Sequence, residues 1–99
     1  MTEQEMESLL ETLFWGEELE VEFRGSRYFI QGYYKEGEAG GQVAHMEAFT
    51  IEHPTLGAGH FLWQMDAAAM SVCATAFLRA KIWDGMDFIR AEREIEWIG

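Results

Sequence analysis

The side chains best suited to chemistry are three histidines within one sixteen-residue stretch, His45, His53 and His60. Imidazole nitrogens and carboxylate oxygens are common metal ligands in proteins. His45 and Glu47 share one face if their segment is a strand. The separations of eight and seven residues between the histidines match no compact metal-binding motif. A small metal-dependent enzyme using His45, Glu47 and His60 is therefore an alternative, and surface or turn histidines are the simpler interpretation.

Nucleophilic catalysis would need the single cysteine, Cys73, or a serine activated by a histidine. Cys73 falls in an apolar helical pattern, where a thiol is buried and unreactive. No serine stands in the strand-turn-helix setting of a nucleophile elbow. The chain also contains no phosphate-loop, dinucleotide-binding, zinc-protease, Cys-x-x-Cys or calcium-loop motif. We therefore expect a protein that is not an enzyme and uses no cofactor.

A row of glutamates, Glu18, Glu20 and Glu22, alternates with apolar residues in the stretch ELEVEF. Strand alternation places the three carboxylates on one face. A tight turn around Gly25-Ser26 would join this strand to the next and leave no lysine or arginine opposite the row. Like charges at neighbouring positions destabilise a sheet. An unneutralised row therefore favours a surface that meets a basic partner.

Aromatic side chains would accompany these carboxylates, since the same hairpin places Phe29 and Tyr33 beside them. The helix expected before the hairpin adds Glu7 and Glu11. Carboxylates at alternate strand positions are about 6.6–6.8 Å apart, a spacing close to that of phosphates along a nucleic-acid strand. We expect all these residues to form a partner-binding surface. The alternative is a sheet face that is only solvated.

The elements that must position these residues predict one α+β domain over residues 1–99. Thr2 and Glu5 form a capping-box pattern, and Gly16 is placed to end the first helix. Asp66 is a candidate N-cap of a later helix. We expect a helix over 3–15, antiparallel strands over 18–24, 27–34 and 42–51, a fourth strand over 60–65, a helix over 66–80, and a short helix over 86–93 before an extended end.

Two side-chain patterns predict which faces of the later elements are buried. The fourth strand would place Phe61, Trp63 and Met65 on one side. The helix that follows would pack an inward stripe on the sheet. Its members are Ala69, Val72, Cys73, Ala76 and Phe77.

Composition limits the partners of this chain. It has 18 acidic and 7 basic residues, a net charge of −11, which disfavours binding to nucleic acid or an anionic membrane. One cysteine excludes an intrachain disulfide. No apolar run is long enough to span a membrane, and the first fifteen residues lack the basic region of a signal peptide. We therefore expect a cytoplasmic protein with a basic protein partner.

The stretches ELEVEFRGSRYFIQGYY and WDGMDFIRAEREIEWI resemble small uncharacterised proteins of bacteria and their phages. Size, acidity and the lack of catalytic residues are also similar to those of anti-CRISPR proteins. This resemblance implies an inhibitor that mimics nucleic acid and blocks a basic, nucleic-acid-handling protein or complex. An antitoxin-like or immunity-like protein that neutralises a basic toxin is an alternative, and a homodimeric structural module is another.

Overall fold

Helix α1 (Glu3–Trp15) opens the chain in the computed structural model, which describes residues 1–99. Thr2 Oγ1 accepts a hydrogen bond from the Glu5 N–H, and the Glu5 carboxylate accepts one from the Thr2 N–H. Gly16 ends the helix at a φ of 75°, a left-handed conformation that suits glycine. The predicted capping box and C-cap are therefore confirmed.

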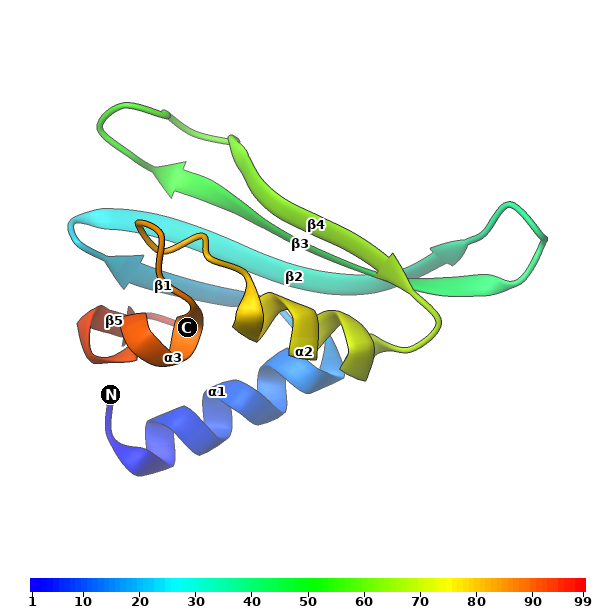
Figure 1. Cartoon of the computed structure of the whole chain (residues 1–99), viewed down its shortest axis with the longest axis horizontal. Helices are drawn as coiled ribbons and strands as arrows, with labels where there is room; N and C mark the ends of the chain where they lie inside the picture. Colours follow the sequence, from blue (N-terminus) through cyan, green and yellow to red (C-terminus); the bar gives the residue numbers. More distant parts are fainter.

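Five strands form one antiparallel sheet with the spatial order β4-β3-β2-β1-β5 (Figure 1). The α+β class and the N-terminal helix are confirmed. The extended C-terminal end supplies a fifth strand, which pairs with β1. The strands are β1 (Leu19–Phe23), β2 (Ser26–Glu36), β3 (Gln42–Glu52), β4 (Phe61–Ala67) and β5 (Ile95–Trp97).

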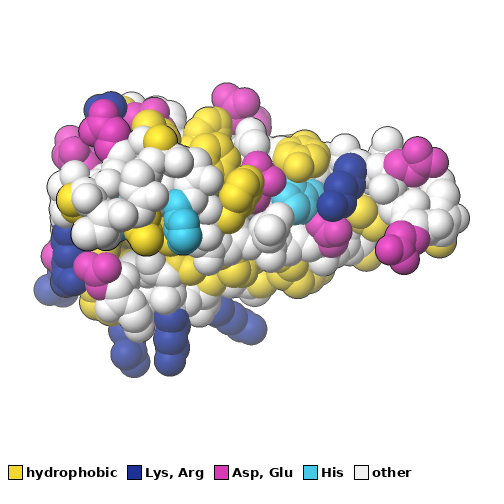
Figure 2. Space-filling view, turned by 90° about the horizontal axis from the view of Figure 1, so that it is seen from above, with side chains coloured by type: hydrophobic (Ala, Val, Ile, Leu, Met, Phe, Trp, Pro, Cys, Tyr) yellow, Lys and Arg dark blue, Asp and Glu magenta, His cyan; other side chains and the backbone are white.

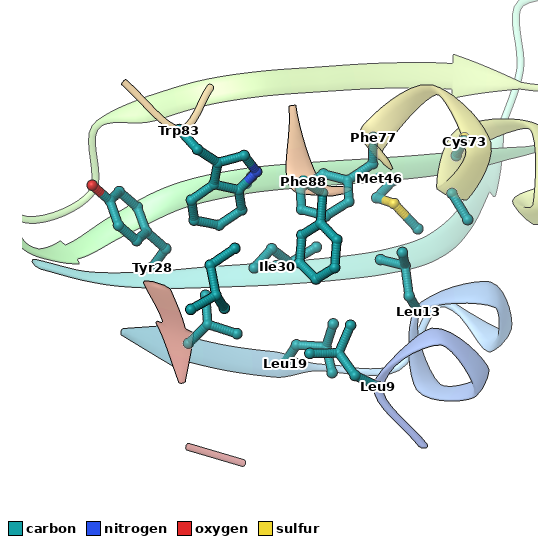
Figure 3. Packing of buried hydrophobic residues seen from close by; sticks show 14 of the residues in the cluster. Leu9, Leu13, Leu19, Tyr28, Ile30, Met46, Cys73, Phe77, Trp83 and Phe88 are labelled. Carbon is teal, nitrogen blue, oxygen red and sulfur yellow. The ribbon is translucent and has the colours of Figure 1, made fainter. Parts of the chain in front are cut away.

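Three helices lie on the same face of this sheet (Figure 1). They are α1, α2 (Met70–Arg79) and α3 (Phe88–Ala91), and a 3-10 turn, η1 (Glu92–Glu94), follows α3. The core lies between the helices and the sheet, and its largest fully buried side chain is Trp83 (Figure 3). Phe23 and Tyr28 of the sheet meet the Trp83 ring edge-on, at centroid distances of 5.5 and 5.3 Å. No helix covers the other face of the sheet.

Helix α2 begins later than the sequence predicts. Asp66 belongs to β4 and does not cap the helix, because pairing with β3 keeps the chain extended through Ala67. The later start leaves Ala69 outside the helix and Val72 48% exposed. Cys73 and Phe77 are buried as predicted. The buried residues of α2 are Met70, Cys73, Ala74 and Phe77.

The turn between β1 and β2 lies one residue earlier than predicted. Arg24 and Gly25 occupy its centre with φ values of 49° and 79°, the two positive angles of a type I′ turn. Arg24 is held there by Asp84, at 3.0 Å, and by both carboxylate oxygens of Glu94, at 2.7 and 2.8 Å. The shift pairs Phe23 with Ser26, whereas a turn centred on Gly25-Ser26 would pair Phe23 with Tyr28, so the predicted register is wrong by two residues.

Candidate functional site

The uncovered side of the sheet, here the open face, presents side chains in rows that cross the strands. In the first row Glu22 of β1 pairs with Arg27 of β2 and with Glu96 of β5, and Arg27 pairs with Glu52 of β3. The Arg27 guanidinium also lies 3.5 Å from Glu20. The expectation that no basic residue faces the carboxylates is therefore wrong, because the shifted register brings Arg27 opposite them.

The carboxylates still outnumber the basic groups at this edge of the open face. Glu20 and Glu22 are half-buried, and Glu18 is exposed just before β1. Arg27 is the one basic residue paired with them in the sheet register. This edge therefore keeps a net negative charge. The acidic margin comprises Glu18, Glu20, Glu22, Glu52 and Glu96.

An aromatic row crosses the next level of the open face. Phe29 of β2 stacks on Phe49 of β3 at a centroid distance of 5.3 Å and an interplanar angle of 8°. Phe61 of β4 continues the row at 5.4 Å from Phe49 and is 51% exposed. A register shift between Ala48 and Phe49 pairs Phe49 with Phe61. Phe61 is thus on the open face, which corrects the prediction that it shares a side with Trp63.

A polar network lies beyond the aromatic row, centred on His45. Its Nδ1 is 2.5 Å from an Asp66 oxygen, and its Nε2 is 2.7 Å from a Glu47 oxygen. Gln31 Nε2 donates to the other Glu47 oxygen at 2.7 Å. The Tyr33 ring lies over His45, at a centroid distance of 4.9 Å. His45 and Glu47 are therefore only 5% and 8% exposed, although no helix covers them.

Both carboxylates of the network are held in the charged form. Burial alone would raise the pKa of Glu47, but hydrogen bonds from Gln31 and His45 outweigh it, and the pKa is lowered. The hydrogen bond from His45 and then that from Lys35, at 3.0 Å, lower the pKa of Asp66. Each ring nitrogen of His45 faces one of these carboxylates, so the ring links Glu47 to Asp66.

The network around His45 forms no metal-ligand set. Both ring nitrogens of His45 already contact carboxylates. His60 lies between β3 and β4, where its backbone bonds to Thr50. No group of three or more histidine, cysteine, aspartate or glutamate side chains is placed to hold a metal ion. His45, Glu47 and His60 are thus not brought together as one ligand set.

The predicted binding residues are divided between two sides of the sheet. Glu20, Glu22, Phe29 and Tyr33 share the open face. Glu7 and Glu11 are exposed on α1, which lies on the opposite side (Figure 1). Sequence reasoning missed the members contributed by β3 and β4. Period-two alternation was a usable signal for β3, whereas in β4 it misplaced Phe61 because of the register shift. The missed residues of these two strands are Phe49, Phe61 and Asp66, and Gln31 and Lys35 of β2 were missed as well.

Comparison with known proteins found no matching family model, no matching curated protein and no matching solved structure. None of the helices has the length and apolar character needed to cross a membrane. The case for a function therefore depends on the open face itself.

Proposed function

We propose that this chain is a non-enzymatic inhibitor that docks its open face on a basic, nucleic-acid-handling protein, in the manner of an anti-CRISPR protein. One observation carries the proposal: an aromatic row lies beside an acidic margin on the one face that no helix covers. Phe61 and Tyr33 are 51% and 43% exposed there. Exposed aromatic side chains on a flat surface are typical of protein interfaces.

Charge selects the kind of partner. Interfaces place an apolar centre within a polar rim, and charges on the rim steer association. Here the aromatic row supplies the apolar centre and the acidic margin supplies the rim. The chain as a whole carries −11, so long-range attraction also favours a basic surface. A nucleic-acid-handling protein offers such a surface because it must neutralise phosphates.

Only one side of the molecule can meet a single flat partner. The proposal therefore keeps Glu18, Glu20 and Glu22 with Phe29 and Tyr33, and it adds Phe49 and Phe61. Glu7 and Glu11 lie across the sheet on α1 and are outside this surface. They supply a matched control, because the same change of charge can be made there without altering the open face.

The test compares two triple variants. The first changes Glu18, Glu20 and Glu22 to Gln, and the second changes Glu3, Glu7 and Glu11 to Gln. Proteins captured from a bacterial lysate at low salt are identified by mass spectrometry, and the binding of the purified pair is then measured. The first variant and Phe61→Ala should both weaken binding, and added salt should weaken wild-type binding steeply. Equal loss in the control variant would overturn the proposal.

The identity of the captured protein tests the second half of the proposal. A nucleic-acid-handling protein supports the inhibitor reading, whereas a basic toxin favours the antitoxin-like alternative. The chain alone should bind neither DNA nor RNA, since its net charge is −11. A mobility shift of DNA or RNA by the purified protein near physiological salt would contradict this expectation.

A further inference from the structure

The two edges of the sheet differ in how well they are protected. β5 forms one edge with only three residues, of which Glu96 is exposed, and it follows Glu94 directly. β4 forms the other edge with seven residues. Short length, charge, proline and bulges are the devices that keep edge strands from pairing. β4 has a register shift near its start and one charged residue, Asp66, and Trp63–Ala67 pair regularly with β3.

Hydrogen-bond alternation shows which β3 residues bond toward β4. Thr50 exchanges backbone hydrogen bonds with Gly59 and His60, so its backbone groups point toward the β4 side. In an antiparallel ladder the orientation repeats every second residue. Counting back from Thr50 to Met46 therefore gives the same orientation, and the Met46 backbone bonds to its partner, Met65.

The residues on either side of Met65 have the opposite orientation. Gln64 and Asp66 pair with Glu47 and His45 without backbone hydrogen bonds to them. Their N–H and C=O groups point away from the sheet, along the outer edge. A strand laid against β4 would find these donors and acceptors in place.

Charge repulsion opposes a second copy less at the β4 edge than at the β5 edge, where Glu96 is exposed. Asp66 is the one charged residue of β4, and it lies 3.0 Å from Lys35 and 2.5 Å from His45. Figure 2 views the molecule from above Figure 1, where β4 lies uppermost. Hydrophobic and uncharged atoms fill most of the middle of this view, and the acidic side chains gather mainly towards its two ends.

We propose that two copies of this chain pair through β4, antiparallel about a two-fold axis at Met65. This register avoids the irregular start of β4 and sets Gln64 opposite Asp66 of the second copy, an amide against a carboxylate. Met65 then meets its own equivalent, and Trp63 meets Ala67. Trp63 and Met65 are half-buried in the monomer, so pairing covers more of their apolar surface. The proposal depends on β4 alone and not on the proposed inhibitor function.

The first test is the mass of the protein in solution, measured by light scattering and native mass spectrometry over a wide range of concentration. Wild type should dimerise. Gln64→Pro should be monomeric, because proline removes an outward N–H that the monomer does not use. A folded Gln64→Pro variant that still dimerises would overturn the proposal. A wild-type protein that stays monomeric at all concentrations would also overturn the proposal. The β4 edge would then be open to pairing with a strand of another protein.

A charge series gives a second test that does not depend on proline. Gln64→Glu places like charges opposite each other at two equivalent positions and should raise the dimer dissociation constant about three- to tenfold at low salt. Gln64→Lys should lower it. If both substitutions leave the constant unchanged, β4 is not the interface.

The register has its own test. Residues directly opposite in a non-hydrogen-bonded pair have Cα atoms about 4.5 Å apart, within reach of a disulfide. Oxidised Met65→Cys should therefore form a covalent dimer efficiently, and Gln64→Cys should form one poorly. The reverse order would overturn the axis at Met65.

Discussion

His45 Nδ1 lies 2.5 Å from Asp66 Oδ1, across the pairing of β3 with β4 and with no helix above it. The other ring nitrogen contacts Glu47, so one imidazole joins two carboxylates. Buried charges are tolerated when each has a partner and its hydrogen bonds are satisfied. Gln31, Tyr33 and Lys35 supply further contacts here. The network thus keeps a charged centre on the open face while excluding water from the ring.

Stability should depend on pH through Glu47. Its folded-state pKa lies below the ordinary 4.5, so its contribution is present above pH 4.5 and is lost as pH falls through the lower folded value. Asp66 acts in the same direction below its ordinary 3.8. Glu47→Gln should therefore be less stable than wild type near neutral pH and lose less stability on acidification.

Urea unfolding at a series of pH values measures this difference. Glu7→Gln is the matched control, because Glu7 is exposed on α1 and forms no salt bridge. The control should keep the wild-type pH dependence. If Glu47→Gln also keeps it, the carboxylate does not stabilise the fold.

Local sequence patterns predicted the helices and strands well, because the interactions that start and end these elements join residues only a few positions apart. The capping box of Thr2 and Glu5 fixes the start of α1, and apolar alternation fixes the buried face of β1. The turn at Arg24-Gly25 was misplaced for the opposite reason. Arg24 adopts a left-handed conformation, with ion pairs to Asp84 and Glu94 that lie 60 and 70 residues away in sequence.

The candidate site was predicted only in part for the same physical reason. The alternation of Glu20 and Glu22 with apolar residues was enough to place both on one face. Phe49 joins Phe61 only through a register shift, which no local pattern reveals. Asp66 has the local features of an N-cap, and its contact with His45, 21 residues away in sequence, keeps it in β4 instead.

Two substitutions in α2 test which side of the helix faces the core. Ala74 is fully buried, whereas Val72 is 48% exposed. Ala74→Glu should lower the free energy of unfolding by about 3–5 kcal/mol, because it buries an unpaired charge. Val72→Glu should change it by less than about 0.5 kcal/mol. Thermal or urea unfolding measures the stability of both variants. Equal destabilisation would show that α2 turns a different side toward the core.

Gly32 should resist substitution because three elements meet at its Cα. Its N–H donates to the Gly16 carbonyl at 3.0 Å, and an added Cβ would lie 2.7 Å from Met70 Sδ and 2.9 Å from Gly16 Cα. The backbone at Gly16 cannot yield as a flexible side chain would. Gly32→Ala should therefore destabilise the protein by about 1–3 kcal/mol.

Gly41→Ala is the control for this prediction, since nothing lies within 4 Å of its added Cβ. It should unfold at nearly the wild-type urea concentration. Comparable stability of Gly32→Ala and Gly41→Ala would mean that α1 and α2 approach β2 less closely than the structure places them.

The Cys73 thiol should be unreactive toward thiol reagents in the folded protein. Its side chain is fully buried, and its sulfur lies 3.8 Å from the Ala44 carbonyl and 3.7 Å from that of Met65. Burial, and to a lesser degree the charge of Asp66, raises the thiol pKa above its ordinary 9.0. A thiol reagent should therefore label wild type only at the rate at which this region opens, and promptly once denaturant is added.

The control separates protection by the fold from slow reagent chemistry. Ser71 is exposed on the same helix, so Ser71→Cys in a Cys73→Ala background should react at once in the native state. A solution condition that stabilises the fold should slow the labelling of Cys73, because the region opens less often. The same condition should not change the labelling rate at position 71 in the Ser71→Cys variant. If native wild type reacts as fast as the Ser71→Cys variant, α2 does not hold this cysteine against β3 and β4 in solution.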